Sequence, residues 1–439
     1  MKLLLISVGS RGDIEPFLAL AQALLDDGHE VHYALQNESN YQSIVPSGVT
    51  VHPLPFVSND FYKFMNPSHG ADHPNPRVRF VGVVTDLIGE LVLPCYQQVM
   101  EVAKDCDVIV TSSLARSLAF ALTQELSIPT YLVHLQPLLP TGLFPHYSNA
   151  DEFVECMTKD PSTLVLKDDY LEGYWELERF QYDFLKERLD KMYADNGLAP
   201  LLTFDENKKI LSGNSPSVHI VNAFSNDIFP PTPDAGPNVH DVGALGDAYV
   251  PKAFEPPVKD SDLVTFLNTG AQKPICIGFG SMPYDAEKVQ GLLNVVQELE
   301  QRVVLVGKAL TLPESLEKIE WIEQNVRHVD GLPYAWLLPQ CSVMVSHGGA
   351  GVMHAALRAG CACVISPLMG DQFVHAKLLE KKGLGAQAGQ SMNSMTMEEF
   401  KSALEKALQC RDTASALGAQ MRNKENYGVE KLVKILKAS

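Results

Sequence analysis

The sequence predicts an α/β protein built from two doubly wound domains. In both halves of the chain, short apolar runs of strand type alternate with segments compatible with helices. Such alternation is typical of parallel sheets that helices cover on both faces. The chain has 439 residues, more than one hydrophobic core usually serves, so two domains are expected. A proline-rich break in the periodicity between Phe229 and Pro257 is the expected connection between them.

Strand-then-helix units follow one another in the first half. The expected strands are 2–8, 30–34, 108–110 and 130–134, and the expected helices include 14–27 and 118–126. A proline-rich loop follows the last of these strands. A long amphipathic helix is expected at 169–196, and its aromatic stripe is more typical of a core surface than of a ligand site.

The second half repeats the pattern. Its expected strands are 274–280, 303–306, 343–346 and 363–366, with helices between them, and the pattern from 397 to 439 is helical. We therefore expect a first domain at 1–235, a linker at 236–262, a second domain at 263–415 and a helical segment at 416–439.

Composition and charge exclude several classes of protein. Hydrophobic residues make up 46% of the chain and charged residues 20%, as in ordinary globular proteins. The formal net charge of −18 argues against binding to nucleic acid or to anionic lipid. The apolar start of the chain is shorter than the core of a signal peptide, and no apolar run reaches the ~18 residues that span a bilayer. Eight scattered cysteines without a CxxC pair indicate reduced thiols and hence a cytoplasmic protein.

A glycine-rich motif in the second domain is the most specific local signal. His347-Gly348-Gly349-Ala350-Gly351 lies between an apolar run of strand type and a helix-compatible segment. Because glycine lacks a Cβ atom, such a turn lets a diphosphate approach the backbone amides closely, and the helix dipole favours the anion. His347 stands beside the turn as a further hydrogen-bond donor.

Two polar residues follow the next expected strand. This strand, 362–366, ends at Pro367, and Asp371 and Gln372 come shortly after it. Ligands of open α/β sheets bind at the edge where the strands end, so these side chains are expected beside the glycine turn. A carboxylate and an amide together can hold several sugar hydroxyls. The two motifs therefore predict a site for a nucleotide sugar.

Two stretches of the chain carry a family resemblance. The segment 343–385, with HGGAG and then SPLMGDQ, resembles the donor signature of the GT-B glycosyltransferases in the UDP-glycosyltransferase superfamily. The opening SVGSRGDIEP, residues 7–16, resembles the sterol glucosyltransferases and the bacterial glycosyltransferases of natural-product antibiotics. The resemblance implies the GT-B fold, in which two Rossmann-like domains face each other across a cleft and the last helix crosses back to the first domain.

Asp13 has two interpretations. An Asp before a helix is a common N-cap, and capping alone would explain the residue. The resemblance places the general base of the family on the Asp of the GSRGD motif, where it would deprotonate the acceptor hydroxyl that attacks the anomeric carbon. We favour the catalytic interpretation, which implies transfer of the sugar with inversion.

The resemblance also assigns the donor site. The expected diphosphate-binding residues are Ser10, Gly12, Ser281, His347, Gly348, Gly349, Ala350 and Gly351, while Val329 would lie near the nucleotide base and Asp371 and Gln372 would bind the sugar. For Ser281, a helix-capping role is equally consistent with the sequence. Ser346 and Val352 depart from the family, because many relatives carry a histidine and a hydroxyl residue at these two places.

The acceptor site is expected in the proline-rich loop of the first domain, at His134, Gln136 and His146. By the resemblance, the aromatic helix at 169–196 is a further candidate for acceptor contact. The apolar loop 138–144 is the expected place for a transient membrane contact. No metal is expected, and the histidines of 68–73 are better explained as part of a loop than as metal ligands.

The leading hypothesis is a monomeric hexosyltransferase that moves glucose from UDP-glucose to a hydroxyl of a sterol or another lipid. A glycosyltransferase of a polyketide or peptide natural product is an alternative, as is a noncatalytic relative that binds a sugar nucleotide or a lipid. An oxidoreductase with a dinucleotide cofactor fits less well. The turn at 9–12 lacks the GxGxxG spacing, and no acidic residue clearly ends the second strand.

Overall fold

The computed structural model describes residues 1–38, 41, 44–57, 60, 76–258, 261–280, 287–312, 319–424 and 427–438. The chain forms two compact units. The first is Met1–Gly246 together with Asn426–Ser439, and the second is Asp247–Glu425. The boundary at Gly246 falls inside the expected linker, 236–262.

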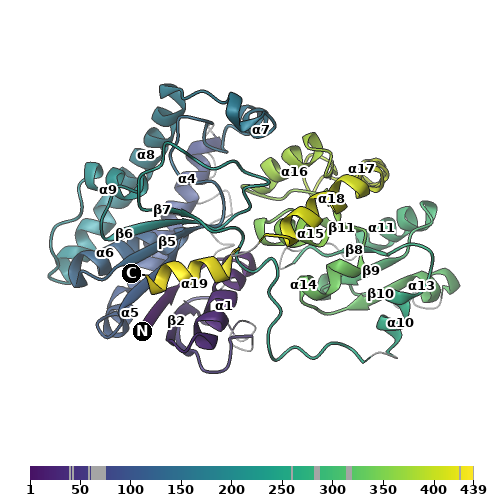
Figure 1. The fold of residues 1–439 in the computed structure, drawn as a ribbon, viewed down its shortest axis with the longest axis horizontal. Coiled ribbons are helices and arrows are strands. Elements are labelled where there is room, and N and C mark those ends of the chain that lie inside the picture. The colour runs from purple at the N-terminus through teal and green to yellow at the C-terminus, as the bar shows by residue number, and fades with distance from the viewer. Residues whose placement is uncertain are drawn as a thin grey trace. The chain divides into compact units, whose positions relative to one another are not determined.

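The first unit is built on a parallel sheet whose described strands have the order β3-β2-β1-β4-β5-β6-β7 (Figure 1). They are β1 (Lys2–Ile6), β2 (Glu30–Gln36), β3 (Thr50–Leu54), β4 (Val108–Ser112), β5 (Thr130–His134), β6 (Val218–Asn222) and β7 (Val239–Asp241). The apolar side chains of β1 are fully buried from Leu3 to Ile6, as expected for a central strand covered on both faces. Edge strand β3 contains Pro53, which a sheet tolerates at its edge.

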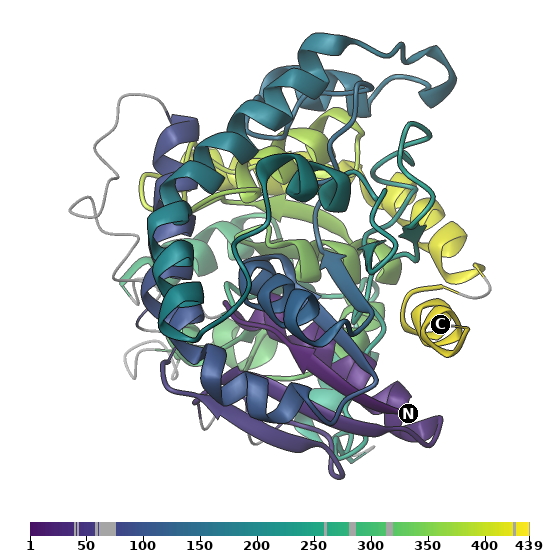
Figure 2. The ribbon, with the colours of Figure 1, turned by 90° about the vertical axis from the view of Figure 1, so that its left-hand side faces the viewer.

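Helices cover both faces of this sheet. They are α1 (Arg11–Asp26), α4 (Pro76–Leu87), α5 (Tyr96–Ala103), α6 (Arg116–Leu126), α7 (Ala150–Met157), α8 (Asp168–Asp195), α9 (Phe204–Leu211) and α19 (Val429–Lys437). Short turns of π-helix (Ile88–Val92) and 3₁₀-helix (Leu93–Cys95, Ser113–Ala115, Pro161–Thr163) connect some of them. Figure 2 shows α8 running beside α4, and Arg188 of α8 forms ion pairs with Asp86 and Glu90.

The long aromatic helix predicted at 169–196 is α8. Tyr170 and Tyr174 of its first turns are buried, whereas Phe184 is 49% exposed. The buried part of the stripe therefore belongs to the core of the first unit, which is the interpretation that the sequence favoured.

The end of the chain returns to the first unit. Helix α19 packs against α1, with Leu432 and Leu436 buried (Figure 1). An ion pair of 2.9 Å joins Lys437 of α19 to Asp27, the C-cap of α1. The returning segment starts near residue 426 and not at 416, because α18 (Arg411–Arg422) belongs to the second unit.

The second unit contains a parallel sheet with the described strand order β10-β9-β8-β11-β12-β13. The strands are β8 (Ile275–Ile277), β9 (Val303–Val306), β10 (Val326–Val329), β11 (Val343–Ser346), β12 (Ala362–Ile365) and β13 (Gly385–Gln387). Besides α18, its helices are α10 (Asp262–Asn268), α11 (Glu287–Glu298), α13 (Glu320–Asn325), α14 (Tyr334–Leu337), α15 (Ala350–Ala359), α16 (Gln372–Lys381) and α17 (Met397–Gln409). Two 3₁₀ turns, Lys308–Leu310 and Leu338–Gln340, complete the unit.

Both sheets reverse their strand order at one point. The reversal lies between β1 and β4 in the first sheet and between β8 and β11 in the second. Open α/β sheets bind ligands at such a switch point, beyond the carboxyl ends of the strands. The GSRGD motif follows β1 and the HGGAG motif follows β11, so each motif lies at the switch point of its own sheet.

The apolar loop 138–144 is not the membrane contact that the sequence suggested. Its Leu139, Leu143 and Phe144 are buried, because the loop packs into the first unit. Among the described residues, the most exposed large aliphatic side chains are instead Val258, Val165 and Leu166, at 74%, 72% and 59%. Within the described part of the chain, no helix is both long enough and apolar enough to cross a membrane.

Candidate active site

Asp13 is the third residue of α1, and Ser10 is the N-cap of this helix. Its Oδ2 atom accepts hydrogen bonds from the Ser10 amide (2.8 Å) and the Ser10 hydroxyl (3.0 Å). An acidic residue at this position commonly reaches back to the N-cap in a capping box. Asp13 is therefore not the N-cap that the simpler interpretation proposed, although one of its oxygens does serve the cap. The carboxylate is half-buried.

Gly9 makes room for the Asp13 carboxylate. Its φ angle is +134°, and a Cβ atom at this position would collide with the side chain of Asp13. A side chain at residue 9 would therefore displace the carboxylate. Of the two predicted phosphate contacts in this turn, Gly12 is exposed and Ser10 is half-buried, with its hydroxyl engaged by Asp13.

Buried polar atoms lie at the carboxyl end of β5 and β6. His134 ends β5 in register with Asn222 of β6, and each is only 2% exposed. His134 Nδ1 and Asn222 Oδ1 are buried without a hydrogen-bond partner among the described residues. Burial, together with the nearby positive charge of Arg116, lowers the pKa of His134 to about 3. His134 is therefore buried and neutral, and its role in an acceptor site stays a prediction.

The other two predicted acceptor residues lie in the loop after β5. Gln136 and His146 are half-buried. The His146 ring meets the ring of Tyr174 edge-on at 5.3 Å, and its Nδ1 lies 2.9 Å from the Ser148 hydroxyl. His146 therefore takes part in fixing the loop against α8, and its acceptor role stays a prediction.

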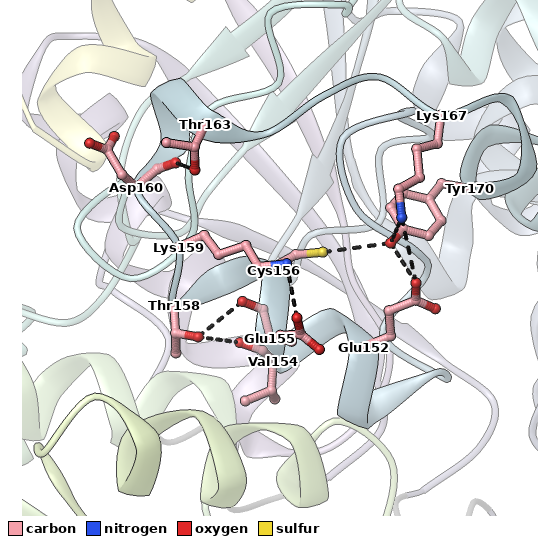
Figure 3. A network of polar contacts seen from close by, with 10 residues as sticks. All are labelled: Glu152, Val154, Glu155, Cys156, Thr158, Lys159, Asp160, Thr163, Lys167 and Tyr170. Carbon is pink, nitrogen blue, oxygen red and sulfur yellow. Dashed lines mark hydrogen bonds and ion pairs between the residues drawn. The ribbon is translucent and has the colours of Figure 1, made fainter.

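A network of polar contacts holds the segment before α8 against the loop that follows β5. Tyr170 of α8 donates to Glu152 of α7 (2.5 Å) and accepts from Lys167 (2.6 Å), as Figure 3 shows. The Lys167 amide in turn donates to the carbonyl of Gly142 (2.8 Å). The segment before α8 is thereby held over the apolar loop, which explains why that loop is buried.

In the second unit, the HGGAG motif forms the predicted turn from strand to helix. Gly348 has φ +86°, and a Cβ atom there would collide with Ile365 of β12. Gly349 is the N-cap of α15, and no side chain caps the first turn of this ten-residue helix. The amides of Ala350 and Gly351 therefore keep the donors that an anion needs at a helix start.

His347 lies beside this turn in a neutral state. Burial lowers the pKa of His347 to about 4, although the negative charge of Asp371 acts in the opposite direction. Its Nδ1 atom is buried and has no hydrogen-bond partner among the described residues. A neutral imidazole carries one N–H and one acceptor nitrogen, so one ring nitrogen of His347 can donate a hydrogen bond to a phosphate oxygen.

Two further histidines support the turn. His375 of α16 donates from Nδ1 to the carbonyl of Gly348 (2.8 Å), and its Nε2 lies 3.9 Å from Asp371 Oδ2. His354 of α15 donates from Nδ1 to the carbonyl of Ala350 (2.8 Å). The side chain of His354 is buried. His375 was missed, although it stands one helical turn after Asp371.

The side chains of Asp371 and Gln372 have different surroundings. Gln372 is buried, and its Oε1 accepts from the amides of Leu368 (2.8 Å) and Met369 (3.1 Å). The Asp371 side chain remains 18% exposed. Asp371 is thus the better placed of the two to meet a sugar hydroxyl, while Gln372 shapes the loop.

Two other donor residues were predicted, Val329 and Ser281, and the structure describes only Val329. Val329 is half-buried at the carboxyl end of β10, where its carbonyl accepts from the Gly307 amide (2.9 Å). Ser281 lies outside the described residues, as do the histidines of 68–73. Within the described ranges, no group of three His, Cys, Asp or Glu side chains is arranged to hold a metal ion.

The buried neutral histidines make stability depend on pH. Burial lowers the pKa of His354 to about 4, so the unfolded chain binds its proton more readily than the folded one. We expect the free energy of unfolding to be highest above about pH 6.5 and to fall by on the order of 3 kcal/mol toward pH 4 for this residue. Urea denaturation at a series of pH values measures the fall. The variant His354→Gln should flatten it, and an equal slope in both proteins would contradict the assignment.

Two family models match parts of the chain. Residues 290–428 match the C-terminal domain of erythromycin biosynthesis protein CIII-like proteins. Residues 3–78 match the N-terminal domain of glycosyltransferase family 28. The matched regions contain the HGGAG and GSRGD motifs respectively.

Curated relatives are sterol 3-beta-glucosyltransferases. UGT80B1 of Arabidopsis thaliana is 28% identical over 407 residues, which cover 88% of this chain and 59% of the relative. A sterol 3-beta-glucosyltransferase of Saccharomyces cerevisiae (strain YJM789) is 26% identical, over 90% of this chain and 32% of the relative. The chain thus spans less than two thirds of the length of these relatives.

Solved structures share the fold along the whole chain. The glycotransferase of kitacinnamycin has a TM-score of 0.65 at 17% identity, covering 100% of this chain and 98% of its own. The Streptomyces glycosyltransferase SsfS6, complexed with thymidine diphosphate, has a TM-score of 0.62 at 17% identity, with 100% of both chains covered. The chain therefore has the GT-B fold of glycosyltransferases, and in sequence it resembles the sterol glucosyltransferases, as its two motifs predicted.

Proposed function

We propose that this protein is an inverting glycosyltransferase that moves glucose from UDP-glucose to a hydroxyl of a lipophilic acceptor, with a sterol as the first candidate. The observation that carries the proposal is the start of α15. An uncapped helix N-terminus, a glycine turn and the neutral His347 with a buried unpaired nitrogen meet at the switch point of the second sheet. Such a place suits a diphosphate.

The second unit would hold the donor. The amides of Ala350 and Gly351 and a ring N–H of His347 would bind the diphosphate, and the helix dipole would stabilise the charge that the leaving nucleotide gains. Asp371 would accept hydrogen bonds from sugar hydroxyls. A glycosyltransferase of similar fold has been solved with thymidine diphosphate, which supports a nucleoside diphosphate as the ligand of this region.

Ser346 explains one departure from the family. Its hydroxyl accepts a hydrogen bond from the Gly348 amide (3.1 Å). Where many relatives carry a histidine, this chain therefore has a residue that stabilises the turn itself. Donor binding would then depend on backbone amides more than on side chains.

Asp13 would act as the base. It would take the proton of the acceptor hydroxyl while the acceptor oxygen forms its bond to the anomeric carbon and the bond from that carbon to the diphosphate oxygen breaks. The electron pair leaves with the nucleoside diphosphate, and attack opposite to it inverts the configuration. No metal ion takes part in this scheme, because amides, the helix dipole and His347 balance the charge.

The sterol acceptor is supported by the curated relatives, and the cytoplasmic location by the eight free cysteines. A natural-product acceptor is the alternative that the structural neighbours suggest by fold alone. An acceptor panel should therefore contain a sterol, a neutral lipid alcohol and a polyketide aglycone.

A transfer assay tests the proposal. With UDP-glucose and the acceptor panel, in EDTA, the wild-type protein should form a glucoside. Asp13→Asn should lower kcat by about 100- to 10,000-fold, because the amide cannot take the proton. Thermal shift should show that UDP still stabilises this variant.

Several results would speak against the proposal. Retained activity in Asp13→Asn would show that Asp13 is not the base. Dependence of the activity on an added metal ion would show that the metal-free mechanism is wrong. Stabilisation by UDP without transfer to any acceptor would favour a noncatalytic binding protein, and stabilisation by NAD alone would favour an oxidoreductase.

The support from His375 can be tested through donor affinity. His375→Phe keeps an aromatic ring but removes the hydrogen bond to the Gly348 carbonyl, so the turn loses one restraint. We expect UDP to bind about fivefold to tenfold more weakly, as measured by calorimetry. His219→Phe, in the first unit, is the matched control and should bind UDP normally. Equal affinity in His375→Phe would mean that the turn does not need this side chain.

A further inference from the structure

Gln36 binds the turn that carries Asp13. It is the last residue of β2 and is fully buried. Its Oε1 accepts from the Gly9 amide (3.2 Å), and its Nε2 donates to the Gly9 carbonyl. One side chain therefore engages both polar groups of a single residue, from a neighbouring strand.

The restraint on Gly9 reaches the Asp13 carboxylate by direct contact. Gly9 adopts a φ of +134°, and the Asp13 side chain lies where a Cβ atom of Gly9 would be. The next amide, that of Ser10, donates to Asp13 Oδ2. If Gly9 rotates, both the surface under the carboxylate and the direction of the Ser10 amide change. The position of Asp13 is thus tied to the amide of Gln36.

The end of the second strand has a known use in dinucleotide-binding sheets, where an acidic residue holds the ribose. In this chain the place is taken by an amide that points to the first turn. An amide can both accept and donate, whereas an ionised carboxylate can only accept, so the amide can satisfy the N–H and the carbonyl of Gly9 together. A glutamine at position 36 therefore suits the two backbone groups of Gly9.

We propose that Gln36 is a positioning residue for the reaction, which holds Asp13 in the orientation needed to take the acceptor proton. The inference rests on the proposed function, because it assigns Asp13 the role of base. Gln36 itself touches neither the acceptor nor the donor in this scheme. Its loss should lower the rate of transfer without weakening the binding of UDP.

The first test replaces the amide with an apolar side chain of similar length. Gln36→Met removes both hydrogen bonds to Gly9, and we expect kcat to fall by about 100-fold, as for small displacements of catalytic groups. The affinity for UDP, measured by calorimetry, should stay within twofold, because α15 and its turn lie in the other unit.

Tyr33→Phe is the matched control. Tyr33 is also fully buried on β2, and its hydroxyl lies 2.5 Å from the Ser7 hydroxyl, so the change removes a buried hydrogen bond beside the same turn. We expect it to lower the melting temperature but to leave kcat within twofold. If Tyr33→Phe and Gln36→Met lower kcat equally, Gln36 has only a structural role, and the proposal is wrong.

A second variant keeps the test informative if Gln36→Met does not fold. Gln36→Glu introduces a carboxyl that reproduces both hydrogen bonds when protonated but faces the Gly9 carbonyl with a negative oxygen when ionised. Burial favours the protonated form. We expect kcat relative to the wild type, at each pH, to be near one at acidic pH and to decline as pH rises.

The outcomes separate this inference from the proposed function. A wild-type protein that transfers no sugar overturns both. The positioning role alone is overturned if an active wild type keeps its kcat in Gln36→Met, or if the relative kcat of Gln36→Glu stays constant across the pH range in which the introduced carboxyl ionises. A pH-dependent ratio, with UDP affinity unchanged, supports it.

Discussion

The turn between β11 and α15 is the constraint on which the second unit depends. Gly348 has a positive φ and packs against Ile365, so the chain can turn from strand to helix without a side chain in the way. The Gly348 amide donates to the Ser346 hydroxyl, and the Gly348 carbonyl accepts from Nδ1 of His375, so neither group can rotate freely. The open amides at the start of α15 and the place of His347 both follow from this turn.

The first unit uses the same physical device with different residues. Gly9 also has a positive φ. It packs against Asp13 where Gly348 packs against Ile365, and both of its polar groups are bound by Gln36 from a neighbouring strand. In each unit a glycine provides the space and a buried polar side chain removes the freedom that glycine brings. The capping bonds between Ser10 and Asp13 then fix one carboxylate oxygen and orient the other.

The sequence was sufficient for the class of fold and for the two turns, because these depend on local features. Glycines between an apolar run and a helix are visible in the chain, and so are the polar residues after 362–366. Among the described strands, the four edge strands β3, β7, β10 and β13 and the inner strand β6 were missed. The edge strands are only partly buried, so they lack the continuous apolar run that marks a central strand. His375 and Gln36 were missed for another reason. Their partners, Gly348 and Gly9, stand 27 residues away, so the pairing depends on sheet order that no local pattern records.

The return of α19 to the first unit has a consequence for the order in which the protein can fold. Because the chain is made from its N-terminus, all of Asp247–Glu425 is made after the body of the first unit and before helix α19. Ribosomes add residues at about 5–20 per second, so this takes several seconds or more. During that interval the surface of α1 that receives Leu432 and Leu436 has no covering helix. The first unit therefore completes its core only after the second unit has left the ribosome.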